Sequence, residues 1–366
     1  MKKILLLLTL LNIYSVINAQ KIKNNLSIGG YAQVDYIHPK NEIATVDLHR
    51  MVLYVGYQFS DKVSFESEVE FEHVKQLEVE QAFINYRLGS NLTAKAGLMI
   101  VPMGLINQTH EPTTFFTVNR PGQDHDIIPS TWTQIGVGLN GTSNNLSLKY
   151  QVYIFNGIKS YQDGIPFLRG SDGLRKGRQG GAEGFSSQAN YAAKLNYYGI
   201  AGLNIGLAGY FGNTQTTDIN LKDSYVGISM IGLDAAYQKN NVTIRGQYVF
   251  NNLSNTEAYN SLTGRDVGSK MDGFYIESGY NILPLFDEKA TEKLVLFSRY
   301  ETYDTQANVA GLLMKNNAYD RKITTFGLNY FMAPGAVFKA EYQVRDNSVT
   351  NADVANSFNM GIGVSF

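Results

Sequence analysis

The chain contains no cysteine, which excludes a disulfide framework and any thiolate metal site. Its formal net charge is only −1, and no Lys/Arg block is long enough to suggest a nucleic-acid partner. After residue 20 no stretch approaches the roughly 18 consecutive apolar residues of a transmembrane helix. Proline (8) and tryptophan (1) are scarce, so the fold class must be inferred from other residue types.

The first twenty residues, MKKILLLLTLLNIYSVINAQ, combine two lysines, an apolar run and a small residue, Ala19, before Gln20. This order predicts a secretory signal peptide at residues 1–19. An uncleaved anchor helix is the alternative, but a spanning helix needs about 20 apolar residues. The remaining residues, 20–366, show no domain boundary, and the exported product is therefore either soluble or a β-barrel.

Tyrosine (24), phenylalanine (19) and glycine (35) are abundant, a composition that favours strands joined by tight turns. Alternating polarity recurs in about sixteen segments, each near the 9–11 residues that cross a membrane as a strand. The predicted strands are residues 26–36, 46–59, 62–74, 78–88, 91–101, 133–140, 146–156, 188–198, 203–213, 225–238, 242–252, 273–283, 293–304, 322–332, 337–346 and 357–366. The sequence thus predicts an all-β protein.

The connections between these segments alternate between long and short. Short ones such as SDK (60–62) and KNN (239–241) carry turn-forming residues, whereas long ones include 102–132 and 157–187. Such alternation places all tight turns at one rim and all large loops at the other, as in bacterial outer-membrane barrels. We therefore predict a transmembrane antiparallel β-barrel of about 16 strands in the bacterial cell outer membrane.

Charged and apolar residues separate onto opposite faces of the predicted strands, because successive residues alternate in direction. A mid-strand Arg or Lys facing lipid would cost roughly 2–4 kcal/mol, so the charged face must be the lumen. The predicted pore-lining residues are Arg50, Glu66, Glu68, Glu70, Glu72, Lys95, Lys149, Lys194, Arg245, Arg299, Lys339 and Arg345. Asp234, Glu277 and Glu341 belong to the same inward set.

A barrel of about 16 strands is too wide for side chains to fill, so we expect a strongly polar lumen with an aqueous channel. Passive diffusion of small hydrophilic solutes or ions follows, which is the function of a porin. Acid is concentrated on residues 62–74 while base is spread over other strands, a pattern that suggests a transverse field or simple hydration and pairing of the charges. The charge pattern leaves anion or cation preference open.

The segment 102–132 is too long for an ordinary connection, and such loops are usually functional. Folded inward, it would narrow the channel with four charged residues: Glu111, Arg120, Asp124 and Asp126. The DHD run at 124–126 resembles a metal site, but no second ligand cluster with known spacing accompanies it, and no metal site or other cofactor is predicted. The glycine-rich segment 157–187 is expected to be a surface loop, with the alternative that its basic residues attract anions.

Two other functions are alternatives to diffusion through the barrel. A barrel hydrolase needs a nucleophile and a base within hydrogen-bond reach, and no strand pairs a Ser with a His on one face, so no catalytic residue is predicted. A structural or adhesive barrel would use its loops as the working part. Conductance through a planar bilayer separates a porin from both.

The C-terminal segment NSFNMGIGVSF alternates strictly and stops at Phe366. From Phe358 onward its even-numbered residues are apolar, and its odd-numbered residues are small or polar. We expect this strand to pair with the one near residue 26 and so close the barrel, because an open edge is not tolerated in hydrocarbon. Phe366 would then stand at the periplasmic rim, among the aromatic residues of the membrane interface.

The segments RMVLYVGYQFSDKVSFESEVEF and EQAFINYRLGSNLTAKAGLMIVPMGL resemble the phosphate-selective porin O and P family, most closely over residues 46–120. The resemblance rests on Arg50 with its LYVGY strand, on Ala82–Tyr86, and on Gly97, Pro102, Gly104 and Leu105. It implies a sixteen-stranded outer-membrane porin in outer-membrane lipid, commonly a homotrimer, that passes small solutes or anions such as phosphate. It also implies that the barrel assembly machinery reads the terminal Phe366.

Overall fold

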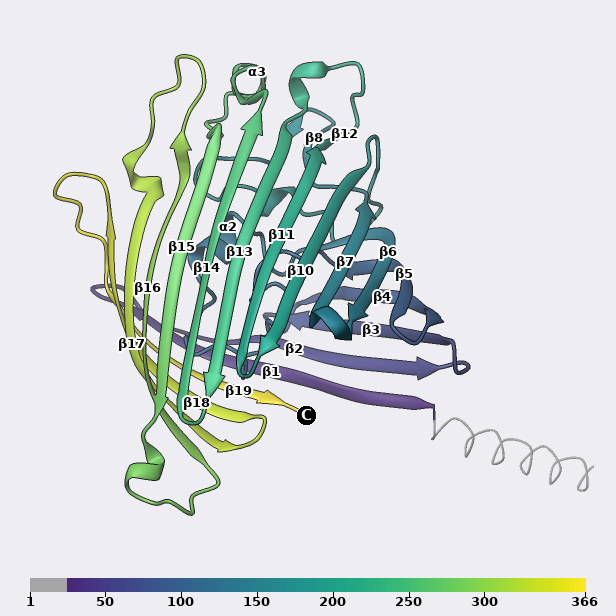
Figure 1. Ribbon diagram of the computed structural model, residues 1–366. Helices are drawn as coiled ribbons and strands as arrows, with labels where there is room; N and C mark the ends of the chain where they lie inside the picture. Colours follow the sequence, from purple (N-terminus) through teal and green to yellow (C-terminus); the bar gives the residue numbers. More distant parts are fainter. Residues whose placement is uncertain (1–24) are drawn as a thin grey trace, which may run out of the picture.

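A computed structural model describes residues 25–366, in which sixteen antiparallel strands close into a barrel (Figure 1). The barrel strands are β1 Leu26–Pro39, β2 Thr45–Gln58, β3 Val63–Glu72, β4 Gln76–Gly89, β5 Leu92–Ile100, β6 Thr133–Ser143, β7 Leu148–Phe155, β10 Asn190–Ile200, β11 Leu203–Asn213, β13 Gly227–Lys239, β14 Val242–Ser254, β15 Lys270–Asn281, β16 Lys293–Asn308, β17 Asp320–Ala333, β18 Ala336–Asn347 and β19 Ser357–Ser365. Each predicted segment overlaps one of these strands, so the predicted barrel is confirmed. The signal peptide predicted at 1–19 lies outside the described residues.

The remaining elements are short and belong to the connections. They are the small sheet β12-β8-β9 (β8 Lys159–Gln162, β9 Ile165–Pro166, β12 Gln215–Thr216), the helices α2 Gly122–Asp126 and α3 Thr256–Thr263, and single 3₁₀ turns at Asn144–Leu146, Arg175–Gly177, Lys222–Ser224, Leu283–Leu285 and Asn317–Tyr319. No helix among residues 25–366 is long and apolar enough to cross a membrane.

The alternating residues of each strand face opposite sides of the barrel wall. On β13 the side chains of Ile231 and Leu233 are about half exposed on the outside, while Met230 and Asp234 point inward and are buried. Neighbouring strands repeat this pattern, so the outer surface is a continuous apolar belt. Lipid is the solvent that such a belt requires.

The connections divide between the two rims as the sequence predicted. The segments with α3 and with β8 and β12 lie at one rim, and the tight turns lie at the other (Figure 1). Residues 282–292, between β15 and β16, are the long exception at the rim of tight turns, where they project beyond it (Figure 1). Residues 73–75 are the short exception at the opposite rim.

The seam of the barrel is the pairing of β1 with β19, in which Val34 lies opposite Ile362. Beyond the end of β19, the backbone N–H of Phe366 donates to the Gly30 carbonyl at 2.9 Å. The Gly30 N–H returns a bond to the Phe366 carbonyl at 3.0 Å. The terminal residue therefore closes the ladder, and its ring, 75% exposed, lies at the edge of the apolar belt.

Substituting alanine at Gly30 is expected to weaken this seam, because a Cβ there would lie 2.3 Å from the Val52 carbonyl oxygen and 3.2 Å from the Phe366 ring. Overpacking of this kind typically costs about 1–3 kcal/mol. A folded barrel migrates faster on a denaturing gel than the heat-unfolded chain. The temperature at which this faster band disappears should be lower for Gly30→Ala than for the wild type. Gly89→Ala is the matched control, since nothing lies within 4 Å of its Cβ position, and equal melting of both variants would contradict the prediction.

Candidate functional site in the barrel lumen

The connection between β5 and β6, residues 101–132, folds into the lumen and is called the inner loop below. Its apolar side chains Val101, Met103, Phe115 and Trp132 are at most 1% exposed. The loop carries α2 and follows the inside of the wall before returning to β6 (Figure 1). The length of this segment suggested that it could fold into the barrel, and the structure shows that it does.

Charged side chains of the wall hold the inner loop through its backbone. Lys339 Nζ on β18 donates to the carbonyls of Phe115 and Thr117, each at 2.8 Å. Lys194 Nζ on β10 donates to the carbonyl of Gly104 at 2.7 Å. Both lysines are nearly fully buried between the wall and the inner loop, and they attach the loop to the wall.

Strands β14, β16 and β18 supply further anchors. Arg245 donates to an inner-loop carbonyl, and Arg299 Nη1 donates to Thr117 Oγ1 at 2.5 Å. Glu341 accepts the backbone N–H of Val118 at 2.8 Å. These bonds supply partners that buried backbone groups of a non-regular segment would otherwise lack. On these three strands, the charged side chains that were predicted to line an aqueous pore instead form hydrogen bonds with the inner loop.

Three of the anchoring charges are also neutralised by carboxylates of the wall. Lys194 lies 3.0 Å from Asp234, Arg245 lies 2.7 Å from Glu277, and Arg299 lies 3.2 Å from Glu301. Buried charges need such partners, because an unpaired one would cost several kcal/mol. The inward residues thus form ion pairs of three kinds. Arg245–Glu277 joins neighbouring strands, Lys194–Asp234 spans β11, and Arg299–Glu301 lies within β16.

The predicted row of glutamates on β3 points inward and divides into two pairs. Glu66 accepts from Asn85 at 2.6 Å and Glu68 from Gln81 at 2.7 Å, both on β4. The other two, Glu70 and Glu72, lie 3.4 and 3.8 Å from the guanidinium of Arg50. Arg50 therefore offsets negative charge at one end of the row.

Lys95 and Lys149 lie apart from the inner loop, near the tight turns that precede β5 and β7. Lys95 Nζ stands 4.1 Å above the centre of the Phe83 ring, and Lys149 Nζ stands 5.7 Å from that of Tyr198. They belong to the half of the lumen nearest the short turns.

The four charged residues predicted on the loop have different surroundings. Arg120 donates to Thr131 Oγ1 at 3.0 Å. Asp124 is fully buried and accepts from Gln247 Nε2 at 3.0 Å, and burial raises the pKa of its carboxyl to about 7. Asp126 forms an ion pair with a wall arginine at 3.3 Å, while Glu111 precedes the turn that faces β19.

The side chains of the DHD run do not converge. Asp124 points to the wall at Gln247, whereas His125 is half exposed and contacts Asp126 at 2.6 Å. Asp126 is in turn occupied by Arg321. The run therefore places its three side chains in two different environments.

One side of the lumen is filled by an apolar core. It is built by both long loops and by the inward side chains of the wall: Met103, Ile127, Ile128, Trp132, Ile158, Leu168, Leu174, Tyr210, Ile228, Met230 and Val249. The expectation of a lumen polar all round was wrong here, because apolar residues occupy inward positions on β7, β10, β11, β13 and β14. Residues 156–189 also pack inward, contrary to the expected surface loop, and are called the second loop.

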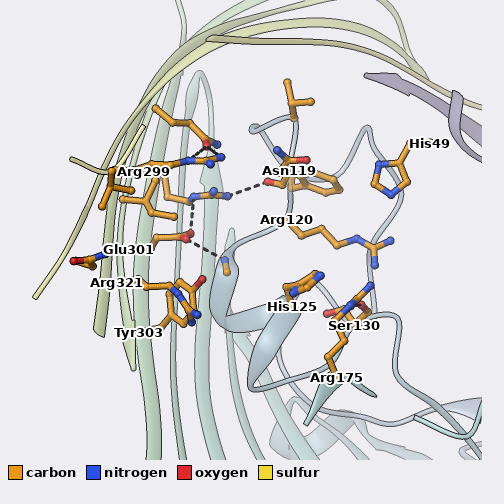
Figure 2. A pocket seen from close by; sticks show the side chains of 18 of the residues that line it. His49, Asn119, Arg120, His125, Ser130, Arg175, Arg299, Glu301, Tyr303 and Arg321 are labelled. Atoms are coloured by element: carbon orange, nitrogen blue, oxygen red, sulfur yellow. Dashed lines mark hydrogen bonds and ion pairs between the residues drawn. The ribbon is translucent and has the colours of Figure 1, made fainter. Parts of the chain in front are cut away.

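The open part of the lumen beside the inner loop is a cavity of about 680 Å³ (Figure 2). It is bounded by the inner loop, the second loop and the long-loop ends of β2 and β16–β18. Six arginines face it, against three carboxylates: Arg50, Arg120, Arg175, Arg299, Arg321 and Arg345, with Glu72, Glu301 and Asp346. Figure 2 shows the arginines of the two loops reaching into the same space as His125.

Three of these arginines have no carboxylate within 4.0 Å in the described chain. Arg120 and Arg175 donate to neutral groups of the inner loop, the latter to the Ser130 carbonyl at 2.6 Å. Arg345 donates to Gln343 on its own strand. Burial and neighbouring Arg178 lower the pKa of Arg175 to about 9, so it remains charged at neutral pH. The cavity therefore carries a net positive charge.

Sequence reasoning missed two residues that join the inner loop to the opposite wall. Glu80 Oε1 on β4 lies 2.8 Å from His110 Nε2, and both side chains are buried. Residue 80 falls at an irregularity in the β3–β4 pairing, which turns its side chain inward against the simple alternation. A hydrophilic residue out of phase inside an otherwise regular strand is the signal that could have revealed it.

The family model for the phosphate-selective porins O and P matches residues 21–360, nearly the whole chain. The chain belongs to the phosphate-selective porin O and P family. The resemblance inferred from the sequence is thereby confirmed. An uncharacterised protein of Aquifex aeolicus (strain VF5) is 30% identical to this porin over 360 residues, covering 92% of this chain and 81% of that protein.

Solved structures share the fold of this porin at low identity. An anion-selective porin from Comamonas acidovorans superposes with a TM-score of 0.60 at 11% identity, covering 93% of this chain and 99% of that one. The outer-membrane channel DcaP of Acinetobacter baumannii gives 0.61 at 13%, covering 93% and 97%. A trimer form of the outer-membrane protein OmpT of Vibrio cholerae gives 0.59 at 13%, covering 93% and 99%. The protein is an outer-membrane diffusion porin, as predicted.

Proposed function

We propose that this porin is selective for small anions, inorganic phosphate among them, and that the arginines around the lumen cavity set this preference. The observation that carries the proposal is the excess of six arginines over three carboxylates on one cavity. A net positive potential concentrates anions and repels cations from a narrow aqueous passage. The family name and the anion-selective fold relative point in the same direction.

The two loops supply the decisive charges. Arg120 on the inner loop and Arg175 on the second loop approach the cavity from different segments, while Arg345 comes from the wall. Their hydrogen bonds to carbonyl, hydroxyl and amide oxygens orient the guanidinium groups without cancelling their charge. A guanidinium presents several N–H donors to an anion, which suits bidentate recognition of phosphate.

The proposal divides the residues predicted to line the pore or to lie on the constriction loop by role. Arg50, Arg120 and Arg345 act on the passing solute, together with Arg175. The buried Lys194, Arg245, Arg299 and Lys339 act on the inner loop. Transport under this proposal is passive and includes no chemical step, so the porin is not an enzyme.

We also propose that residues 1–19 are removed as a signal peptide and that residues 20–366 work as a homotrimer in outer-membrane lipid. The trimer form of a protein of the same fold supports the oligomer. Insertion by the barrel assembly machinery, with Phe366 as its recognition residue, is part of the same proposal, and the exposure of that ring supports it.

The reversal potential of the purified porin in a planar bilayer tests the selectivity. With a tenfold KCl gradient, the potential should lie toward the equilibrium potential of chloride. Replacing Glu66, Glu68, Glu70 and Glu72 together by Gln should move it further in that direction, since negative charge is removed from the lumen. A potential near that of potassium would contradict anion selectivity, and a barrel that does not conduct would instead favour a structural or adhesive role.

A further inference from the structure

The inner loop touches the wall opposite its main anchors at a compact group of three side chains. His110 comes from the loop, Glu80 from β4 and Glu68 from β3. One ligand atom from each residue lies within 4.8 Å of the other two. His110 and Glu80 are buried, and Glu68 is partly exposed. A nitrogen and two carboxylates thus converge at one point from three segments.

The hydrogen bonds of His110 leave its Nε2 lone pair directed at this point. Nδ1 lies 3.1 Å from the carbonyl oxygen of Asn107, which can only accept, so the ring proton belongs on Nδ1. In the neutral ring Nε2 is then an acceptor, yet it faces the acceptor Glu80 Oε1 at 2.8 Å. Two acceptors approach this closely only when a proton or another cation lies between them. The arrangement therefore calls for a positive ion at that point.

The two carboxylates are oriented by neutral donors on their outer oxygens. Tyr31 Oη donates to Glu80 Oε2 at 3.3 Å, and Gln81 Nε2 donates to Glu68 Oε2 at 2.7 Å. A backbone carbonyl on the far nitrogen of a histidine and donors on the far oxygens of carboxylates are the contacts that orient metal ligands. The inward oxygens of both carboxylates remain available.

The surrounding charges favour a cation in spite of two nearby arginines. Arg50 is occupied by the two glutamates that follow Glu68 on β3. Arg120 donates to Thr131 and to the backbone carbonyl of His110. Glu111, next to His110 in the sequence, adds a buried carboxylate oxygen that has no hydrogen-bond partner among residues 25–366. Acid therefore exceeds uncompensated base around the site.

We propose that Glu68, Glu80 and His110 form a binding site for a first-row divalent cation of the Zn²⁺ type, which joins the inner loop to strands β3 and β4. One imidazole and two carboxylates are a donor set that such ions accept. Two ligands of a tetrahedral Zn²⁺ stand about 3.3 Å apart, so the His110–Glu80 pair needs to open by only about half an ångström. The ion takes the place of the proton between Nε2 and Oε1.

Proton and metal compete for the same nitrogen, so binding depends on pH. Metal ligation requires the unprotonated ring. Affinity for Zn²⁺ should therefore fall as the pH is lowered.

Calorimetric titration of the full-length, EDTA-treated porin in detergent with Zn²⁺ tests the site. One saturable Zn²⁺ site per chain is expected, weaker by more than about tenfold in Glu80→Gln and in His110→Gln. Glu68→Gln leaves the His110–Glu80 pair intact and should also weaken binding, so it carries the test if either other variant does not fold. His125→Gln is the matched control, a second inner-loop histidine beside a carboxylate, and should bind Zn²⁺ as the wild type does.

Two results would overturn the proposal. The first is the absence of saturable Zn²⁺ binding to the folded wild-type porin. The second is an affinity unchanged by substitution of Glu68 and of the other two ligands. Neither result depends on ion selectivity, so the site and the proposed anion preference stand or fall separately.

Discussion

Replacing Arg120 and Arg175 together by glutamine is expected to remove most of the anion preference of the porin. These two side chains bring positive charge to the cavity from the two loops, and no carboxylate within 4.0 Å in the described chain compensates either one. A unit charge contributes about 1 kcal/mol at 4 Å in water and less when salt screens it. Removing two should lower the anion-to-cation permeability ratio by about threefold or more.

The reversal potential in a KCl gradient measures this change, and it should be larger at low ionic strength than at high. Arg169→Gln is the control: it removes one positive charge from the second loop, as Arg175→Gln does, but its exposed side chain is not among those that line the cavity. If the control shifts the potential as much as the double variant, the effect belongs to the overall charge of the chain. The proposed role of the cavity arginines would then be wrong.

The strands could be predicted because their pattern is local. A period of two, read between turn residues, located all sixteen strands within a few residues of their observed bounds. The same period gave the inward direction of Arg245, Arg299 and Lys339, since one face had to meet lipid. The polarity of each residue depends on whether it faces lipid or the lumen. The direction of each side chain can therefore be read from a single strand.

The partners of those inward residues could not be predicted, because they lie far away in the chain. Lys339 bonds to carbonyls at residues 115 and 117, more than two hundred positions earlier. A backbone carbonyl leaves no mark on the sequence, so a lysine that faces water and one that faces a loop have the same signature. The apolar core was missed for a related reason: inward apolar residues on β11 and β13 have meaning only once the loops fill the lumen.

The site at Glu80 and His110 was hidden by a break in the period. Counted from Ile84, which faces lipid, residue 80 should also face outward. The irregularity between Glu68 and Val69 in the pairing with β4 reverses that direction. The DHD run resembles a metal site because its residues are adjacent in the sequence. The side chains that do converge, Glu68, Glu80 and His110, come from three separate segments. Spacing in sequence is informative only where the backbone between ligands is regular.

Replacing Lys339 by methionine is expected to release the middle of the inner loop from the wall. Methionine nearly retains the length of the side chain but leaves the carbonyls of Phe115 and Thr117 without the donor that both now share. A buried polar group left unpaired costs about 1–3 kcal/mol, so the two carbonyls together lose about 3 kcal/mol. The adjacent bond from the Val118 N–H to Glu341 should then open far more often.

Amide hydrogen exchange measures the release, because exchange follows local opening. A loss of about 3 kcal/mol corresponds to exchange more than about 100-fold faster in residues 114–119, while the barrel strands should retain their protection. Lys149→Met is the matched control, a lumen lysine on β7 that stands near a tyrosine ring and bonds to no loop carbonyl. Exchange in the loop within twofold of the wild type would mean that the remaining anchors, Arg299 and Glu341 among them, hold this segment without Lys339.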